Sequence, residues 1–146
     1  MTRRRLLIGM AAALLAPAAF AQHSVEIGPQ SRVRVVYLAA DNCGFCREWD
    51  WPGGPRERFL SSELGRAVEF REVRRPYYQQ RLTAAAFGGP LAWVWDRVEV
   101  PGGTPTWIVA VDENPVLVST GLDRWEASVL PQIELLVAKL RELRAQ

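Results

Sequence analysis

Cysteine, histidine and methionine are all scarce in this chain of 146 residues, which has two cysteines, one histidine and two methionines. Two cysteines are too few for a small scaffold that several disulfides hold together. A closed structural zinc site needs four ligands, so with His23 as the only histidine no such site is expected in a single chain. We interpret His23 as an exposed residue near the chain end and assign it no role.

The front of the chain has the pattern of a leader for export. The run Thr2–Arg5 is basic, Leu6–Ala16 is apolar, and Ala19–Ala21 has the small-x-small pattern that signal peptidases cleave. Residues 1–21 are therefore predicted to be a signal peptide, and residues 22–146 to form the mature domain. The alternative is an uncleaved membrane anchor, which the short length and high alanine content of the leader disfavour.

The predicted mature domain also has almost no net charge. Three of the 18 basic residues lie in the leader, which leaves 15 basic residues against 16 acidic ones. The net charge of +2 for the whole chain thus comes from the leader and gives no support to nucleic-acid binding. No other apolar run approaches the length of a membrane span, so the mature domain is predicted to be soluble. The predicted location is the periplasm or the cell exterior, where disulfides persist.

Both cysteines lie in one short stretch, residues 41–47 (DNCGFCR), which directly follows a hydrophobic run at 32–40. That run begins with alternation and ends fully apolar, which predicts a strand that enters the centre of a sheet. If a helix begins near Cys43, then Cys43 and Cys46 lie one turn apart and can form a disulfide. Cys43 would then lie where free N–H groups favour a thiolate. A purely structural disulfide is the weaker interpretation, because closing so short a loop adds little stability.

The helix that begins near Cys43 is predicted to end at residues 52–55 (PGGP), and a helical pattern resumes over 56–64. Trp49 and Trp51 cannot both face the core from one regular helix. At least one of them is predicted to lie on the surface beside the cysteines, where it can contact a polypeptide.

Strand and helix patterns continue through the middle of the chain. Residues 67–73 predict a half-buried strand, and Arg74 and Arg75 after it are interpreted as a solvent-exposed face. A helix is predicted over 77–87. The apolar run at 91–95 fits a helical turn or a strand, because short apolar runs do not decide between the two.

The end of the chain has clearer signals. Residues 107–111 and 116–120 predict an antiparallel hairpin. Asp123 or Ser128 can cap a final amphipathic helix, in whose first turn Pro131 is tolerated. No repeat or linker interrupts these elements, which predicts a single α/β domain.

This order of elements, with Cys43-Gly44-Phe45-Cys46 and a Gly-Gly-Thr-Pro loop at 102–105, resembles the thioredoxin-fold superfamily along nearly the whole mature chain. The resemblance implies a central mixed sheet flanked by helices, with the CxxC pair at the N-terminus of the first main helix. The Gly-Phe between the cysteines is similar to the Gly-Tyr of exported bacterial disulfide isomerases. Thioredoxins carry a buried Asp six residues before the first cysteine, and Tyr37 occupies that position here.

The resemblance implies an enzyme that exchanges disulfides with client proteins. Cys43, as a thiolate, would attack the client disulfide, and the more buried Cys46 would resolve the mixed disulfide. Pro105 would form a cis peptide bond and pack beside both cysteines, and the backbone of Thr104 would pair with an extended client segment. An ordinary turn proline is the alternative for Pro105.

Residues beside the cysteines are expected to tune the reaction. Arg47 would help Cys43 to ionise, Asp41 would oppose ionisation, and Phe45 lies between the two cysteines. No cofactor and no metal are expected. The expected partners are client proteins with thiols or disulfides and a redox protein, not identified by the sequence, that recycles the pair.

Two other functions fit parts of the sequence. A thioredoxin-like domain can hold a soft metal such as Cu(I) through two thiolates and act in the assembly of a respiratory complex. Neither methionine remains after leader removal and no third cysteine is present, which weakens that hypothesis. The other alternative is a domain that keeps the fold and interacts through a surface at Trp93 and Trp95.

Overall fold

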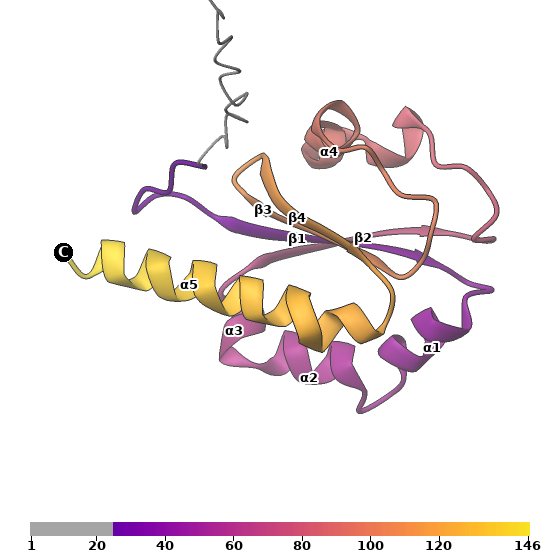
Figure 1. The fold of residues 1–146 in the computed structure, drawn as a ribbon, viewed down its shortest axis with the longest axis horizontal. Helices are drawn as coiled ribbons and strands as arrows, with labels where there is room; N and C mark the ends of the chain where they lie inside the picture. Colours follow the sequence, from indigo (N-terminus) through magenta and orange to yellow (C-terminus); the bar gives the residue numbers. More distant parts are fainter. Residues whose placement is uncertain (1–24) are drawn as a thin grey trace, which may run out of the picture.

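The structure, a computed structural model, describes residues 25–146 (Figure 1). The predicted signal peptide, its cleavage site, His23 and both methionines lie outside the described residues. A four-stranded sheet in the order β2-β1-β3-β4 forms the centre. The strands are β1 Val33–Ala40, β2 Glu69–Arg75, β3 Thr106–Val111 and β4 Asn114–Thr120. The mixed α/β architecture expected from the sequence is confirmed.

The two middle strands are apolar because both of their faces are covered. β1 pairs with β2 in parallel and with β3 antiparallel, and every residue of β3 is buried. The pairing of Leu38 with Thr106 fixes the register between β1 and β3. The carboxyl end of β1 and the start of β3 therefore lie at one edge of the sheet.

Helices cover both faces of the sheet, as Figure 1 shows. One face carries α1 Gly44–Asp50, α2 Pro55–Ser61, α3 Glu63–Arg66 and α5 Leu130–Arg144. The other face carries α4 Ala92–Arg97, preceded by 3-10 turns at Ala84–Phe87 and Gly89–Leu91. The undecided run at 91–95 is thus mostly helical. Trp93 is buried, so the surface expected from Trp93 together with Trp95 does not exist.

Three predicted elements differ from the structure. The helix over 77–87 is wrong, because only Ala84–Phe87 is helical and the segment before it forms turns and coil. The helical pattern over 56–64 is divided at Ser62, whose hydroxyl accepts a hydrogen bond from Gly65 N at 3.0 Å and begins α3. Ser128 is not a helix cap, because it lies inside a π-helical turn at Trp125–Val129.

Aromatic rings fill the core between β1, β3 and the helices. Trp49 is fully buried, and its ring centroid lies 4.5 Å from that of Tyr37, 5.1 Å from that of Trp125 and 5.4 Å from that of Trp107. Trp51, two residues later, is 69% exposed. The prediction that the two tryptophans cannot share the core is confirmed.

Gly65 offers a direct test of the packing between α2 and α3. A Cβ atom at this position would lie 2.0 Å from the backbone oxygen of Phe59, which cannot move without distorting α2. We expect Gly65→Ala to lower the free energy of unfolding by about 1–3 kcal/mol, measured by urea denaturation. Gly88→Ala is the matched control, since no atom lies within 4 Å of its added Cβ. Equal stabilities of the two variants would contradict this packing.

Candidate functional site

The two cysteines lie at the start of α1 and form a disulfide with a Cα–Cα distance of 5.2 Å. Cys43 has extended backbone angles and is the N-cap of the helix. Its sulfur accepts a hydrogen bond from the backbone N–H of Cys46 at 3.1 Å. The same N–H can stabilise a thiolate on Cys43 when the pair is reduced.

The two sulfurs differ in their surroundings. Cys46 is completely buried against the aromatic core, whereas Cys43 keeps 5% of its surface and Phe45 between them is 62% exposed. The exposed guanidinium of Arg47 folds back over this turn. Its Nη1 donates to the backbone oxygen of Asp41 at 3.2 Å, and its Nη2 lies 3.9 Å from where a Cβ of Gly44 would be. A positive charge therefore lies beside the turn that joins the cysteines.

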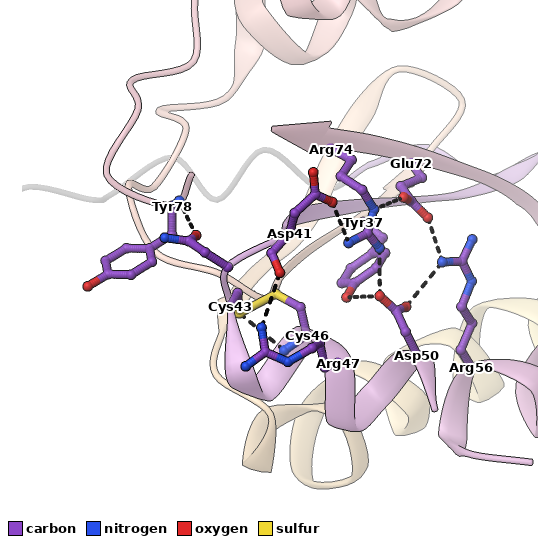
Figure 2. A network of polar contacts seen from close by, with 11 residues as sticks. Tyr37, Asp41, Cys43, Cys46, Arg47, Asp50, Arg56, Glu72, Arg74 and Tyr78 are labelled. Carbon is purple, nitrogen blue, oxygen red and sulfur yellow. Dashed lines mark hydrogen bonds and ion pairs between the residues drawn. A yellow bond between two sulfur atoms is a disulfide. The ribbon is translucent and has the colours of Figure 1, made fainter. Parts of the chain in front are cut away.

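A network of charged side chains extends from the end of α1 to β2 and α2 (Figure 2). Asp50 accepts from Arg56 at 3.1 Å and from Arg74 at 2.6 Å. Glu72 accepts from Arg56 at 2.6 Å and from Arg74 at 2.5 Å. Alternation along β2 places Glu72 and Arg74 on the same face of the sheet, and Arg74 is still classed as exposed, as expected. The interpretation of Arg75 as a solvent-exposed residue is wrong, because Arg75 points to the other face and only 5% of its surface is exposed.

Tyr37 connects this network to the core. Its hydroxyl donates to Asp50 Oδ2 at 3.5 Å. Burial, followed by the nearby charge of Asp50, raises the pKa of Tyr37, so the side chain stays neutral and donates a proton into this bond. Burial lowers the pKa of Arg74, but hydrogen bonds to Glu72 and Asp50 outweigh that effect and raise it overall. Asp50 follows Cys46 by four residues and thus shares its side of α1.

The loop at Thr104 and Pro105 lies at the same sheet edge as the cysteines. The peptide bond between these residues is cis. Pro105 is buried, Thr104 is partly exposed, and the carbonyl of Pro105 accepts from Gly121 N at 2.9 Å. Because Thr106 pairs with Leu38, this loop begins β3 beside the point where β1 leaves the sheet toward Cys43. Direct packing of Pro105 against the sulfurs stays a prediction.

A cavity of about 770 Å³ lies on one side of the cysteine turn. Its lining includes Phe45, Arg58, Gly121, Leu122 and Trp125. Since Gly121 binds the carbonyl of Pro105, the cavity extends from the turn between the cysteines to the segment that holds the cis-proline loop.

On its other side, the cysteine turn is tied to the segment after β2. The side-chain oxygen of Asn42 accepts from the backbone N–H of Tyr78 at 2.8 Å, and its amide donates to Gln79 Oε1 at 3.2 Å. Sequence reasoning missed this contact, since no pattern relates Asn42 to residues 36 positions later.

Two features are absent from residues 25–146. No group of three or more His, Cys, Asp and Glu side chains within this part of the chain is arranged to hold a metal ion. No helix within the same residues is long and apolar enough to cross a membrane.

No family model and no curated protein matches the chain. Several solved structures, however, match the chain. The thioredoxin of Malassezia sympodialis (Mala s 13) is 17% identical with a TM-score of 0.50, over 75% of this chain and 77% of that one. The periplasmic thioredoxin SoxS of Paracoccus pantotrophus is 14% identical over 73% and 97%, with a TM-score of 0.45. Thioredoxin f2 of Chlamydomonas reinhardtii is 20% identical over 70% and 81%, with a TM-score of 0.46.

At 17% identity the likeness to the Malassezia thioredoxin shows the fold and does not extend to substrates or partners. The sheet order, the parallel pairing of β1 with β2, the hairpin of β3 and β4 and the helices on both faces agree with it. The CxxC pair at the start of α1 supports a thiol-disulfide redox role. The chain thus has the thioredoxin fold, as expected from Cys43-Gly44-Phe45-Cys46 and the order of its elements.

Proposed function

We propose that the mature chain is an exported thiol-disulfide oxidoreductase that exchanges disulfides with client proteins. The observation that carries this proposal is the Cys43–Cys46 disulfide at the start of α1, with one sulfur buried completely and the other at the cap of the helix. A disulfide in this position closes only a short loop, so stabilisation of the fold is a poor explanation for it.

The exchange proceeds in two successive attacks of a thiolate on a disulfide. The Cys43 thiolate attacks one sulfur of a client disulfide, forms a mixed disulfide and releases one client thiolate. The Cys46 thiolate then attacks the sulfur of Cys43, restores the Cys43–Cys46 disulfide and releases the second client thiolate. Two electrons pass to the client. The reverse sequence oxidises a client dithiol, and a separate redox protein returns the pair to its starting state.

Charges around the turn support Cys43 as the nucleophile. The N–H of Cys46 points at its sulfur, and the Arg47 guanidinium lies over the turn. Asp41 is the residue that opposes ionisation, but its carboxylate lies 3.6 Å from Arg74, which offsets part of its charge. The balance of these groups therefore favours a thiolate on Cys43 more than the sequence alone indicates.

Client binding is assigned to the surface around the same turn. The backbone of the partly exposed Thr104 would pair with an extended client segment, while Pro105, which has no N–H, places no backbone donor beside the sulfurs. The cavity next to Phe45 can take an apolar client side chain. The leader at 1–21 supports action in the periplasm or outside the cell after cleavage near Ala21.

Two turnover assays on the mature domain test the proposal. We expect the protein to accelerate the reduction of insulin by dithiothreitol, or the reoxidation of reduced ribonuclease in a glutathione buffer, severalfold above the uncatalysed rate. The direction that is faster shows whether the pair acts mainly as a reductant or as an oxidant, because that depends on its reduction potential. Acceleration in neither assay would contradict an oxidoreductase function.

A further inference from the structure

A second cavity, of about 380 Å³, lies on the α4 side of the sheet edge. Its walls come from the end of β2, from the segment that follows β2, and from residues 98–102, which lead into the cis-proline loop. Arg75, Tyr78, Arg81, Trp95, Glu99 and Gly102 are among its lining residues. The two-step exchange described above uses none of their side chains.

Arg75 is unusual among the arginines of the site. Only 5% of its surface is exposed. Its Nη2 donates to the carbonyl of Gly102 at 2.6 Å, while its buried Nε has no hydrogen-bond partner. Within residues 25–146 no carboxylate lies within ion-pair distance of Arg75, whereas Arg74 beside it contacts three. A buried cation without a counter-charge is costly, and an incoming anion would remove that cost.

The walls of the cavity join the segment before Cys43 on one side and the cis-proline loop on the other. The backbone oxygen of Arg75 accepts from Asp41 N at 3.0 Å, and Asn42 binds Tyr78 and Gln79. On the opposite wall, Gly102 lies two residues before Thr104 in sequence. A client segment that pairs with Thr104 while its cysteine is at Cys43 would thus lie close in sequence to a wall of this cavity.

The side chains in the cavity favour an acidic group. A guanidinium presents planar, parallel donors that match a carboxylate. Arg75 and Arg81 outnumber the single acidic lining residue, Glu99. Tyr78 and Trp95, which are 48% and 43% exposed, provide aromatic surface for a polypeptide at the rim.

We propose that this cavity binds a Glu or Asp side chain of the client polypeptide, a few residues from the client cysteine, through an ion pair with Arg75. The proposal rests on the proposed function and deepens it. The protein would then prefer clients that carry a Glu or Asp residue near the reactive cysteine.

Peptide pairs test this preference. Each peptide carries one cysteine as a neutral 2-pyridyl disulfide, and its partner differs only by Gln in place of Glu at one position within four residues of that cysteine. The rate of pyridinethione release by the reduced protein is measured for each. At one or more positions we expect the Glu peptide to react about tenfold faster than its Gln partner, since a charge-assisted pair contributes about 1.4 kcal/mol or more.

Variants assign the preference to Arg75. Arg75→Gln is expected to abolish it, and Arg75→Lys to keep part of it. Arg71→Gln is the matched control, because Arg71 lies on the same strand with 54% of its side chain exposed and outside the cavity. Arg71→Gln should leave both the rates and the preference unchanged.

The possible failures are distinguishable. Equal rates for Glu and Gln at every position in the unmodified protein would overturn the acidic-client proposal and leave the exchange reaction standing, whatever the stability of the variants. A preference that persists in Arg75→Gln would also overturn it. No reaction with any peptide would instead overturn the proposed function.

Discussion

Cys43→Ala is expected to reduce turnover to the uncatalysed rate, whereas Cys46→Ala is expected to trap client proteins as mixed disulfides through Cys43. The difference follows from burial, because Cys46 is completely buried and Cys43 keeps a small accessible surface at the cap of α1. Without Cys46 the first step still occurs, but no thiolate is in place to release the client.

Non-reducing electrophoresis, followed by alkylation and mass spectrometry, measures the trapped species. The double variant, in which both cysteines are alanine, is the control for unspecific association. Trapping by Cys43→Ala alone would reverse the two roles. Absence of trapped clients with Cys46→Ala would remove the support for Cys43 as the nucleophile.

Trp49→Ala is expected to lower the free energy of unfolding by about 3–5 kcal/mol, the range for removing a large buried aromatic side chain. Trp49 lies in α1, three residues after Cys46, and its ring contacts Tyr37, Trp107 and Trp125. The loss would leave a cavity beneath the helix that carries both cysteines.

Trp51→Ala is the matched control, since it removes the same side chain two residues away. Trp51 is 69% exposed, so its removal should change the stability by less than about 0.5 kcal/mol. Urea denaturation followed by circular dichroism measures both variants. Similar losses of stability for the two would show that the packing of α1 differs from this description.

The sequence was sufficient for the parts of the fold that rest on strong local patterns. The apolar run before residues 41–47 predicted β1, and the spacing of Cys43 and Cys46 predicted a disulfide at the start of a helix. The sequence also predicted that Trp49 and Trp51 do not both lie in the core, because one regular helix cannot bury both. It did not identify which of the two is exposed. Each of these inferences depends on residues close together in sequence.

The remaining parts depend on contacts between distant segments. Residues 77–87 have helical composition, but only Ala84–Phe87 is helical, and Tyr78 is instead bound to the distant Asn42. Arg74 and Arg75 are adjacent in sequence, yet one belongs to the network with Asp50 and the other lies buried beside Gly102. Alternation along β2 could have separated the two arginines, but their partners could not be predicted from local pattern.

The central claim is that Cys43 and Cys46 form a redox-active pair, and a redox titration tests it most directly. Protein comprising residues 22–146 is equilibrated in buffers of defined glutathione potential, alkylated, and analysed by mass spectrometry. We predict one two-electron transition between about −120 and −270 mV, the span of members of this fold. A pair that stays oxidised below about −300 mV would be a structural disulfide and would contradict the account.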